Sequence, residues 1–211
     1  MQVPHLAYVA LLSSLVVVIV GVWRYKLLRS EMKILFIFFG FVFIINALSA
    51  YFALQGTNNL WLFHIYTLLE YSALMLVFSY WQKTEKSTLT LRLAIAAFFV
   101  AWLIAKSFLE NLQQSDSFSS SLASVLLIGV SSYMLFVLFQ QNSFSLVRDF
   151  RFWVLSAVLI DHASRVILFA LDNIVLHLPI ADVIKLWSFH WLITIIANFL
   201  YSGSFLCRQY R

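Results

Sequence analysis

Seven apolar stretches follow one another along this chain, and each is long enough to cross a lipid bilayer as a helix. A helix needs about 20 apolar residues to span the hydrocarbon core, and every backbone polar group must be paired there, which favours helices over open strands. With 63% hydrophobic and only 11% charged residues, the chain has too few polar groups to cover a water-facing surface. We therefore predict an all-α fold, a seven-transmembrane-helix bundle that forms a single membrane domain over residues 1–211. The predicted helices cover residues 6–23, 34–54, 60–81, 91–109, 118–139, 150–171 and 183–207.

Among the connections between these stretches, only alternate ones contain lysine or arginine. The connections 55–59, 110–117 and 172–182 contain no lysine or arginine. Cytoplasmic loops carry an excess of basic residues, so we expect the N-terminus outside and the C-terminus in the cytoplasm. Because the bases lie at helix ends and not in one patch, the net positive charge does not indicate a nucleic-acid partner. The basic connections and tail hold Arg24, Lys26, Arg29, Lys33, Lys83, Lys86, Arg148, Arg208 and Arg211, and Arg92 and Arg151 lie just inside the helices that follow.

A weak internal similarity relates the first three stretches to the last three. When Lys33 is aligned with Arg148, Asn46 falls on Asp161 and Ser49 falls on Ser164. After a small insertion, the segment LWLFH at 60–64 falls on LWSFH at 186–190. This register favours a 3+1+3 parallel repeat, whose shared site would lie between the two halves. The alternative is that tryptophan and histidine simply favour the outer interface.

The segment from Phe63 to Tyr71 reads FHIYTLLEY. This segment resembles an uncharacterised family of small bacterial seven-helix integral membrane proteins. The resemblance implies the same topology and a bacterial cytoplasmic (inner) membrane, and it supplies no activity.

Several ionisable and polar residues fall deep inside the apolar stretches. A charged group at the centre of a membrane helix costs about 2.5–3.5 kcal/mol on insertion scales, so such residues are candidates for function. Asp161 and Arg165 are four residues apart and share one helix face. Polar residues from His190 to Ser202 recur at the same spacing of four. The candidate ligand-binding residues, or members of a buried polar network, are Asn46, His64, Tyr66, Glu70, Asp161, His162, Arg165, His190, Thr194 and Asn198.

Two hypotheses can explain why these polar side chains lie inside apolar helices. They could line a polar pocket in the outer half of the membrane, or Glu70, Asp161 and Arg165 could form a static ion-pair network that fixes helix packing. We expect Arg165 to be held by Glu70 or Asp161. We expect Lys106 to extend outward to the membrane surface, and Trp102 to belong to the interfacial aromatic belt.

The function that this pattern favours is a non-enzymatic membrane module, a sensor or partner protein that binds a small anionic or zwitterionic ligand without a cofactor. The expected partners are the lipid bilayer and another membrane protein or a second copy of the chain. The alternatives are a small-solute transporter, a structural subunit of a membrane complex and a membrane metallohydrolase. The metal ligands in the last case would be His64, Glu70, Asp161, His162 and His190, although no HExxH spacing is present.

Overall fold

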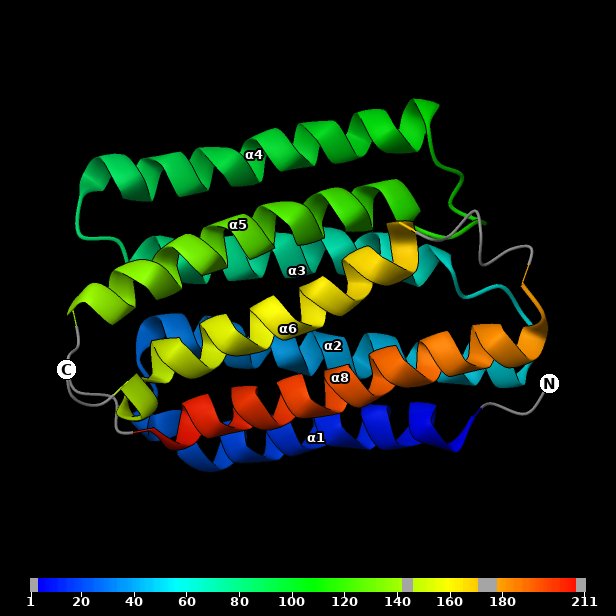
Figure 1. The fold of residues 1–211 in the computed structure, drawn as a ribbon, viewed down its shortest axis with the longest axis horizontal. Helices are drawn as coiled ribbons and strands as arrows, with labels where there is room; N and C mark the ends of the chain where they lie inside the picture. The colour runs from blue at the N-terminus through cyan, green and yellow to red at the C-terminus, as the bar shows by residue number, and fades with distance from the viewer. Residues whose placement is uncertain (1–3, 142–145, 171–177, 208–211) are drawn as a thin grey trace. The chain divides into compact units, whose positions relative to one another are not determined.

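The computed structural model describes residues 4–141, 146–170 and 178–207, and all regular secondary structure within these residues is helical (Figure 1). Two 3-10 helices, η1 (Tyr25–Leu27) and η2 (Leu146–Arg148), accompany the long helices. The long helices are α1 (His5–Arg24), α2 (Ser30–Leu54), α3 (Trp61–Tyr80), α4 (Glu85–Phe108), α5 (Ser117–Gln141), α6 (Phe150–Ala170) and α8 (Ile180–Leu206).

Seven helices in the described residues are long and apolar enough to cross a membrane. The all-α fold and its seven candidate spans are therefore confirmed. The orientation and the repeat stay predictions, and Arg208, Arg211 and the connection residues 171–177 lie outside the described residues.

Helix α4 begins six residues before the predicted start at 91, because its N-terminus carries a local capping signal. The Thr84 side chain accepts a hydrogen bond from the Ser87 amide at 3.2 Å. A threonine in this position satisfies one of the amides that an α-helix leaves unpaired at its start. The apolar pattern alone does not register this cap, since the first turns of α4 are polar.

The turn after α2 depends on a glycine. Gly56 has a φ of 68°, and it is the one described glycine in the left-handed region. The Thr57 amide donates to the Phe52 carbonyl at 3.0 Å in the same turn. A left-handed residue just past a helix end lets the chain satisfy the last carbonyls and reverse direction.

The chain divides into two compact units, which are described separately. Unit 2 is Ser30–Ala123, and unit 1 combines Met1–Arg29 with Ser124–Arg211. In unit 2, α3 packs against both α2 and α4. Tyr71 of α3 stacks on Phe98 of α4 with ring centroids 4.1 Å apart, and offset stacking of this kind adds to the energy of burial.

In unit 1, α8 packs against both α1 and α6, and Figure 1 shows the three helices running side by side. A close approach between α8 and α6 occurs at Gly203, where a Cβ atom would lie 3.4 Å from the Trp153 ring. The fully buried side chains of this unit include Val17, Leu155 and Phe205.

Many large apolar side chains lie on the outside of the helices, whereas several charged ones are buried. On α2, for example, Ile37, Phe41 and Ile44 are each more than half exposed. Glu70 and Asp161, by contrast, are buried. An exposed apolar surface of this extent needs an apolar solvent, which agrees with helices that face lipid.

Candidate functional site

An ion pair lies in the middle of α6. Arg165 Nη2 is 2.5 Å from Asp161 Oδ2, and both side chains are about nine-tenths buried. The second carboxylate oxygen, Oδ1, accepts a hydrogen bond from Thr194 Oγ1 of α8 at 3.0 Å. The spacing of four thus produces the predicted pairing, and Asp161 is one of the two acids that we expected to hold Arg165.

Two histidines flank this pair, each bonded to a serine hydroxyl. His190 Nδ1 of α8 lies 2.8 Å from Ser164 Oγ of α6. His162 Nδ1 lies 3.0 Å from Ser124 Oγ of α5. Either atom of each pair can donate, because the histidine tautomer sets the direction. We call Asp161, Arg165, Thr194, Ser164 and His190 the α6–α8 polar cluster.

The polar residues on α8 serve two neighbours. His190 and Thr194 contact α6, whereas Asn198 Nδ2 donates to Ser13 Oγ of α1 at 2.8 Å. The polar residues predicted at a spacing of four along α8 are therefore present, and Asn198 among them links α8 to α1. A buried amide that finds a side-chain partner avoids the cost of an unpaired polar group.

In unit 2, the predicted candidates Tyr66 and Glu70 bond to each other. The Tyr66 hydroxyl donates to Glu70 Oε1 at 2.6 Å, one helical turn apart on α3. Asn46 is half-buried on α2. The predicted pocket combines residues of both units and stays a prediction.

A second group of charges, which sequence reasoning missed, lies where α3 begins and α4 ends. Lys106 Nζ of α4 is 2.5 Å from Glu110 Oε2 and 2.6 Å from Asp116 Oδ1. It also donates to Ser119 Oγ at 3.0 Å. The prediction that Lys106 extends outward is wrong, because its side chain is only 9% exposed and is enclosed by these acceptors. We call Lys106, Glu110, Asp116, Ser119 and His64 the helix-end cluster.

Glu110 joins the α4–α5 connection to the start of α5. Its Oε1 accepts from the backbone amides of Phe118 at 2.7 Å and Ser119 at 3.2 Å. Burial disfavours the charged carboxylate, but hydrogen bonds from Lys106 and Ser119 outweigh it, so the pKa of Glu110 lies below its ordinary value. An ionised carboxylate at a helix N-terminus is also stabilised by the helix dipole.

His64 is fully buried in the same cluster. Its Nε2 lies 3.1 Å from the Gln114 carbonyl, and its Nδ1 lies 3.3 Å from Asp116 Oδ1. Trp102 of α4 donates from Nε1 to the His64 carbonyl at 3.1 Å, and Lys106 Nζ lies 5.5 Å from the centroid of the Trp102 ring. Trp102 therefore supports the cluster directly, beyond the interfacial role predicted for it.

One set of residues within unit 2 has the composition and spacing of a metal site. Ligand atoms of His64, Glu110 and Asp116 all lie within 4.8 Å of one another. Only His64 belongs to the metal set expected from the sequence. The other expected ligands have polar partners of their own within each unit: Glu70 bonds Tyr66, and His190 bonds Ser164.

The missed residues left a partial signal in the sequence. Lys106 and Glu110 are four apart, the same spacing that identified Asp161 and Arg165. Asp116 and Ser119 gave no comparable signal, because they reach Lys106 through the fold of the α4–α5 connection.

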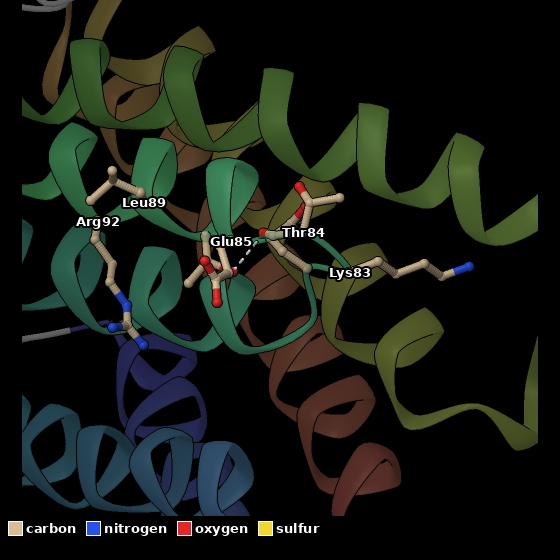
Figure 2. A pocket seen from close by; sticks show the side chains of 7 residues that line it. Lys83, Thr84, Glu85, Leu89 and Arg92 are labelled. Carbon is tan, nitrogen blue, oxygen red and sulfur yellow. Dashed lines mark hydrogen bonds between the residues drawn. The ribbon is translucent and has the colours of Figure 1, made fainter.

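An open groove of about 360 Å³ lies at the α3–α4 connection. Figure 2 shows Lys83 pointing away from Arg92 there, so the two cations do not converge. Arg92 already has partners, since its Nε donates to Ser79 Oγ at 3.4 Å and its guanidinium lies 5.7 Å from the Tyr80 ring centroid. We assign no ligand to this groove. It is lined by Gln82, Lys83, Thr84, Glu85, Thr88, Leu89 and Arg92.

In comparisons with known proteins, no family model, curated protein or solved structure matches this chain. We therefore infer the function from the geometry of the two clusters.

Proposed function

We propose that this chain is a non-enzymatic multi-pass membrane protein that binds a small zwitterionic or anionic ligand at the α6–α8 polar cluster. It would act as a sensor or as a module that transmits binding to a membrane partner. The observation that carries the proposal is the buried Asp161–Arg165 pair in the middle of α6. Charged residues inside membrane helices are costly and concentrate at functional sites.

The chemistry of the pair favours a zwitterion over a simple anion. The planar guanidinium of Arg165 can hold a ligand carboxylate with two parallel hydrogen bonds. Asp161 lies beside it and would repel a second negative charge, but it would attract a ligand ammonium. When a zwitterion binds, its carboxylate would pair with Arg165 and its ammonium with Asp161. The ion pair within the protein is then replaced by two ion pairs with the ligand, and no charge is left uncompensated in a low-dielectric site.

The hydroxyl and imidazole groups around the pair suit the remaining part of such a ligand. Thr194 holds one oxygen of Asp161, which fixes the carboxylate against α8. His190 and Ser164 add polar atoms that can donate or accept. The set resembles binding sites in general, where a few placed polar groups orient a small molecule.

We further propose that the chain lies in a bacterial cytoplasmic membrane with its N-terminus outside, so that the ligand arrives from outside. The distribution of basic residues supports this orientation. Reporter fusions after residues 28, 86, 146 and 211 should then read cytoplasmic, and fusions after 57, 114 and 176 should read external. A cytoplasmic reading at 114 would contradict the orientation.

The ligand proposal is tested by thermal unfolding of the purified full chain in detergent. The panel contains amino acids and betaines, together with carboxylates, amines and neutral solutes of matched size. Zwitterions should raise the unfolding temperature more than the singly charged compounds do. Thr194→Val should weaken that response, whereas Lys185→Gln, which changes an exposed pair on α8, should leave it intact.

A structural subunit without a ligand is the second candidate. It is favoured by the fact that Asp161 already has two side-chain partners, Arg165 and Thr194. In that case the pair would serve helix packing alone, and no zwitterion or anion in the panel would shift the unfolding temperature.

A further inference from the structure

We infer that the helix-end cluster is a binding site for one divalent cation of the zinc type, with His64, Glu110 and Asp116 as ligands. The three side chains converge from the start of α3 and from the connection between α4 and α5. Their ligand atoms lie within 4.8 Å of one another, a separation that one coordinated ion can bridge. This inference does not depend on the ligand proposed for the α6–α8 polar cluster.

The orientation of His64 is the strongest argument. The Gln114 carbonyl can only accept a hydrogen bond, so the 3.1 Å contact requires the proton on Nε2. In the neutral ring, Nδ1 then presents a lone pair to Asp116 Oδ1 at 3.3 Å. These two acceptors face each other in a buried site, an arrangement that a metal ion between them would stabilise.

Two buried ligand atoms that make no hydrogen bond also support a metal ion at this site. Within the described residues, His64 Nδ1 and Asp116 Oδ2 are buried without a hydrogen-bond partner. His64 is 0% exposed and Asp116 is 3% exposed, so water does not compensate these atoms at the surface. Buried polar atoms in native proteins normally find partners, and a bound ion is one of the recognised explanations when no protein group pairs with them.

The surrounding groups orient the ligands as in known metal sites. A metal-binding histidine usually donates its other ring N–H to a carbonyl or carboxylate, and Gln114 provides that carbonyl. Glu110 is held at Oε1 by the Phe118 and Ser119 amides. Its Oε2 accepts from Lys106 Nζ and from Ser119 Oγ, each at 2.5 Å.

Lys106 is the internal competitor for the ion. Its ammonium lies against Glu110 Oε2 and Asp116 Oδ1, two of the atoms that the ion would use. A divalent ion with two carboxylates balances their charge, so the lysine must withdraw when the ion enters. Its long flexible stem allows this movement. One imidazole with two carboxylates suits zinc, whereas calcium prefers oxygen ligands alone.

The test measures zinc bound to the chelator-stripped full chain in detergent, by equilibrium dialysis with elemental analysis. The wild-type protein should bind one zinc ion per chain with preference over calcium. Lys106→Met removes the competing ammonium and should raise zinc affinity by at least about tenfold. His64→Gln and the isosteric Asp116→Asn should each lower it by at least about tenfold.

The exposed His5, on α1, supplies the matched control, because His5→Gln should not change the zinc affinity. Two variants of ligand residues guard against a change that only perturbs folding. Absence of zinc from both the wild-type protein and Lys106→Met would overturn the inference. Unchanged zinc binding in both His64→Gln and Asp116→Asn would overturn the ligand set.

Discussion

The α6–α8 polar cluster and the helix-end cluster each contain a buried cation, but they pair it with different sets of acceptors. In the first, Asp161 and Arg165 lie one turn apart in the middle of a helix and pair with each other. In the second, Lys106 gathers three acceptors from the α4–α5 connection and the start of α5. Removal of Lys106 leaves Glu110 with other donors, because this carboxylate also accepts from the Phe118 and Ser119 amides. The contrast predicts a graded series of mutational effects.

The largest effect is expected from Asp161→Leu, which removes the carboxylate that pairs with the buried Arg165. Removing one partner of a buried ion pair typically costs about 3–5 kcal/mol. The free energy of unfolding in detergent, measured against wild type, gives the result directly. A loss as small as that of a surface substitution would mean that Arg165 relaxes toward water, which would remove the proposed difference between the clusters.

An intermediate effect is expected from Lys106→Met in the presence of a chelator. The substitution preserves much of the apolar stem but removes hydrogen bonds to Glu110, Asp116 and Ser119. Hydrogen bonds to charged groups contribute about 1.5–3 kcal/mol each at most, and the amide donors that Glu110 retains reduce the net loss to about that of one bond. Lys106→Arg, which keeps the charge, is the control. If Lys106→Met cost more than Asp161→Leu, the ranking of the two clusters would be reversed.

A smaller effect is expected from Thr194→Val, which keeps the shape of the side chain but removes the donor to Asp161 Oδ1. The loss should be about 1 kcal/mol, the net value of one hydrogen bond. Thr194→Ser retains the hydroxyl and should recover most of it. Equal stability of the valine and serine variants would indicate that Asp161 does not rely on α8.

No measurable change in unfolding is expected from Lys185→Gln. Lys185 Nζ lies 2.8 Å from Asp182 Oδ1, but its side chain is 77% exposed. Exposed ion pairs are screened by water and salt and contribute little. A clear loss of stability here would show that this end of α8 is enclosed by a partner or by lipid headgroups.

The sequence was sufficient for features with a local period. Apolar length located all seven spans, and the spacing of four located the Asp161–Arg165 pair. Contacts between helices, such as Asn198 with Ser13, required the packing of α8 against α1. The helix-end cluster was missed because Asp116 and Ser119 approach Lys106 only after the α4–α5 connection folds back, and polar residues in a short loop have no periodicity to reveal it.

The same limitation explains the helix boundaries. The start of α4 is set by the side chain of Thr84, and capping of this kind operates in polar sequence where the apolar pattern is silent. The direction of the Lys106 side chain is set by its contacts with Glu110, Asp116 and Ser119. Without such contacts, a lysine near a helix end would extend to water.

We propose that Asp161 and Arg165 form a pair that is both a buried ion pair and a ligand-binding site. A double-mutant cycle with Asp161→Leu, Arg165→Leu and their combination tests it, with unfolding measured with and without the zwitterions of the panel. We predict that the double variant recovers much of the stability lost by either single variant but no longer responds to zwitterions. Additive losses would show that the two residues are not coupled, and a stable double variant with a full zwitterion response would exclude the pair as the binding site.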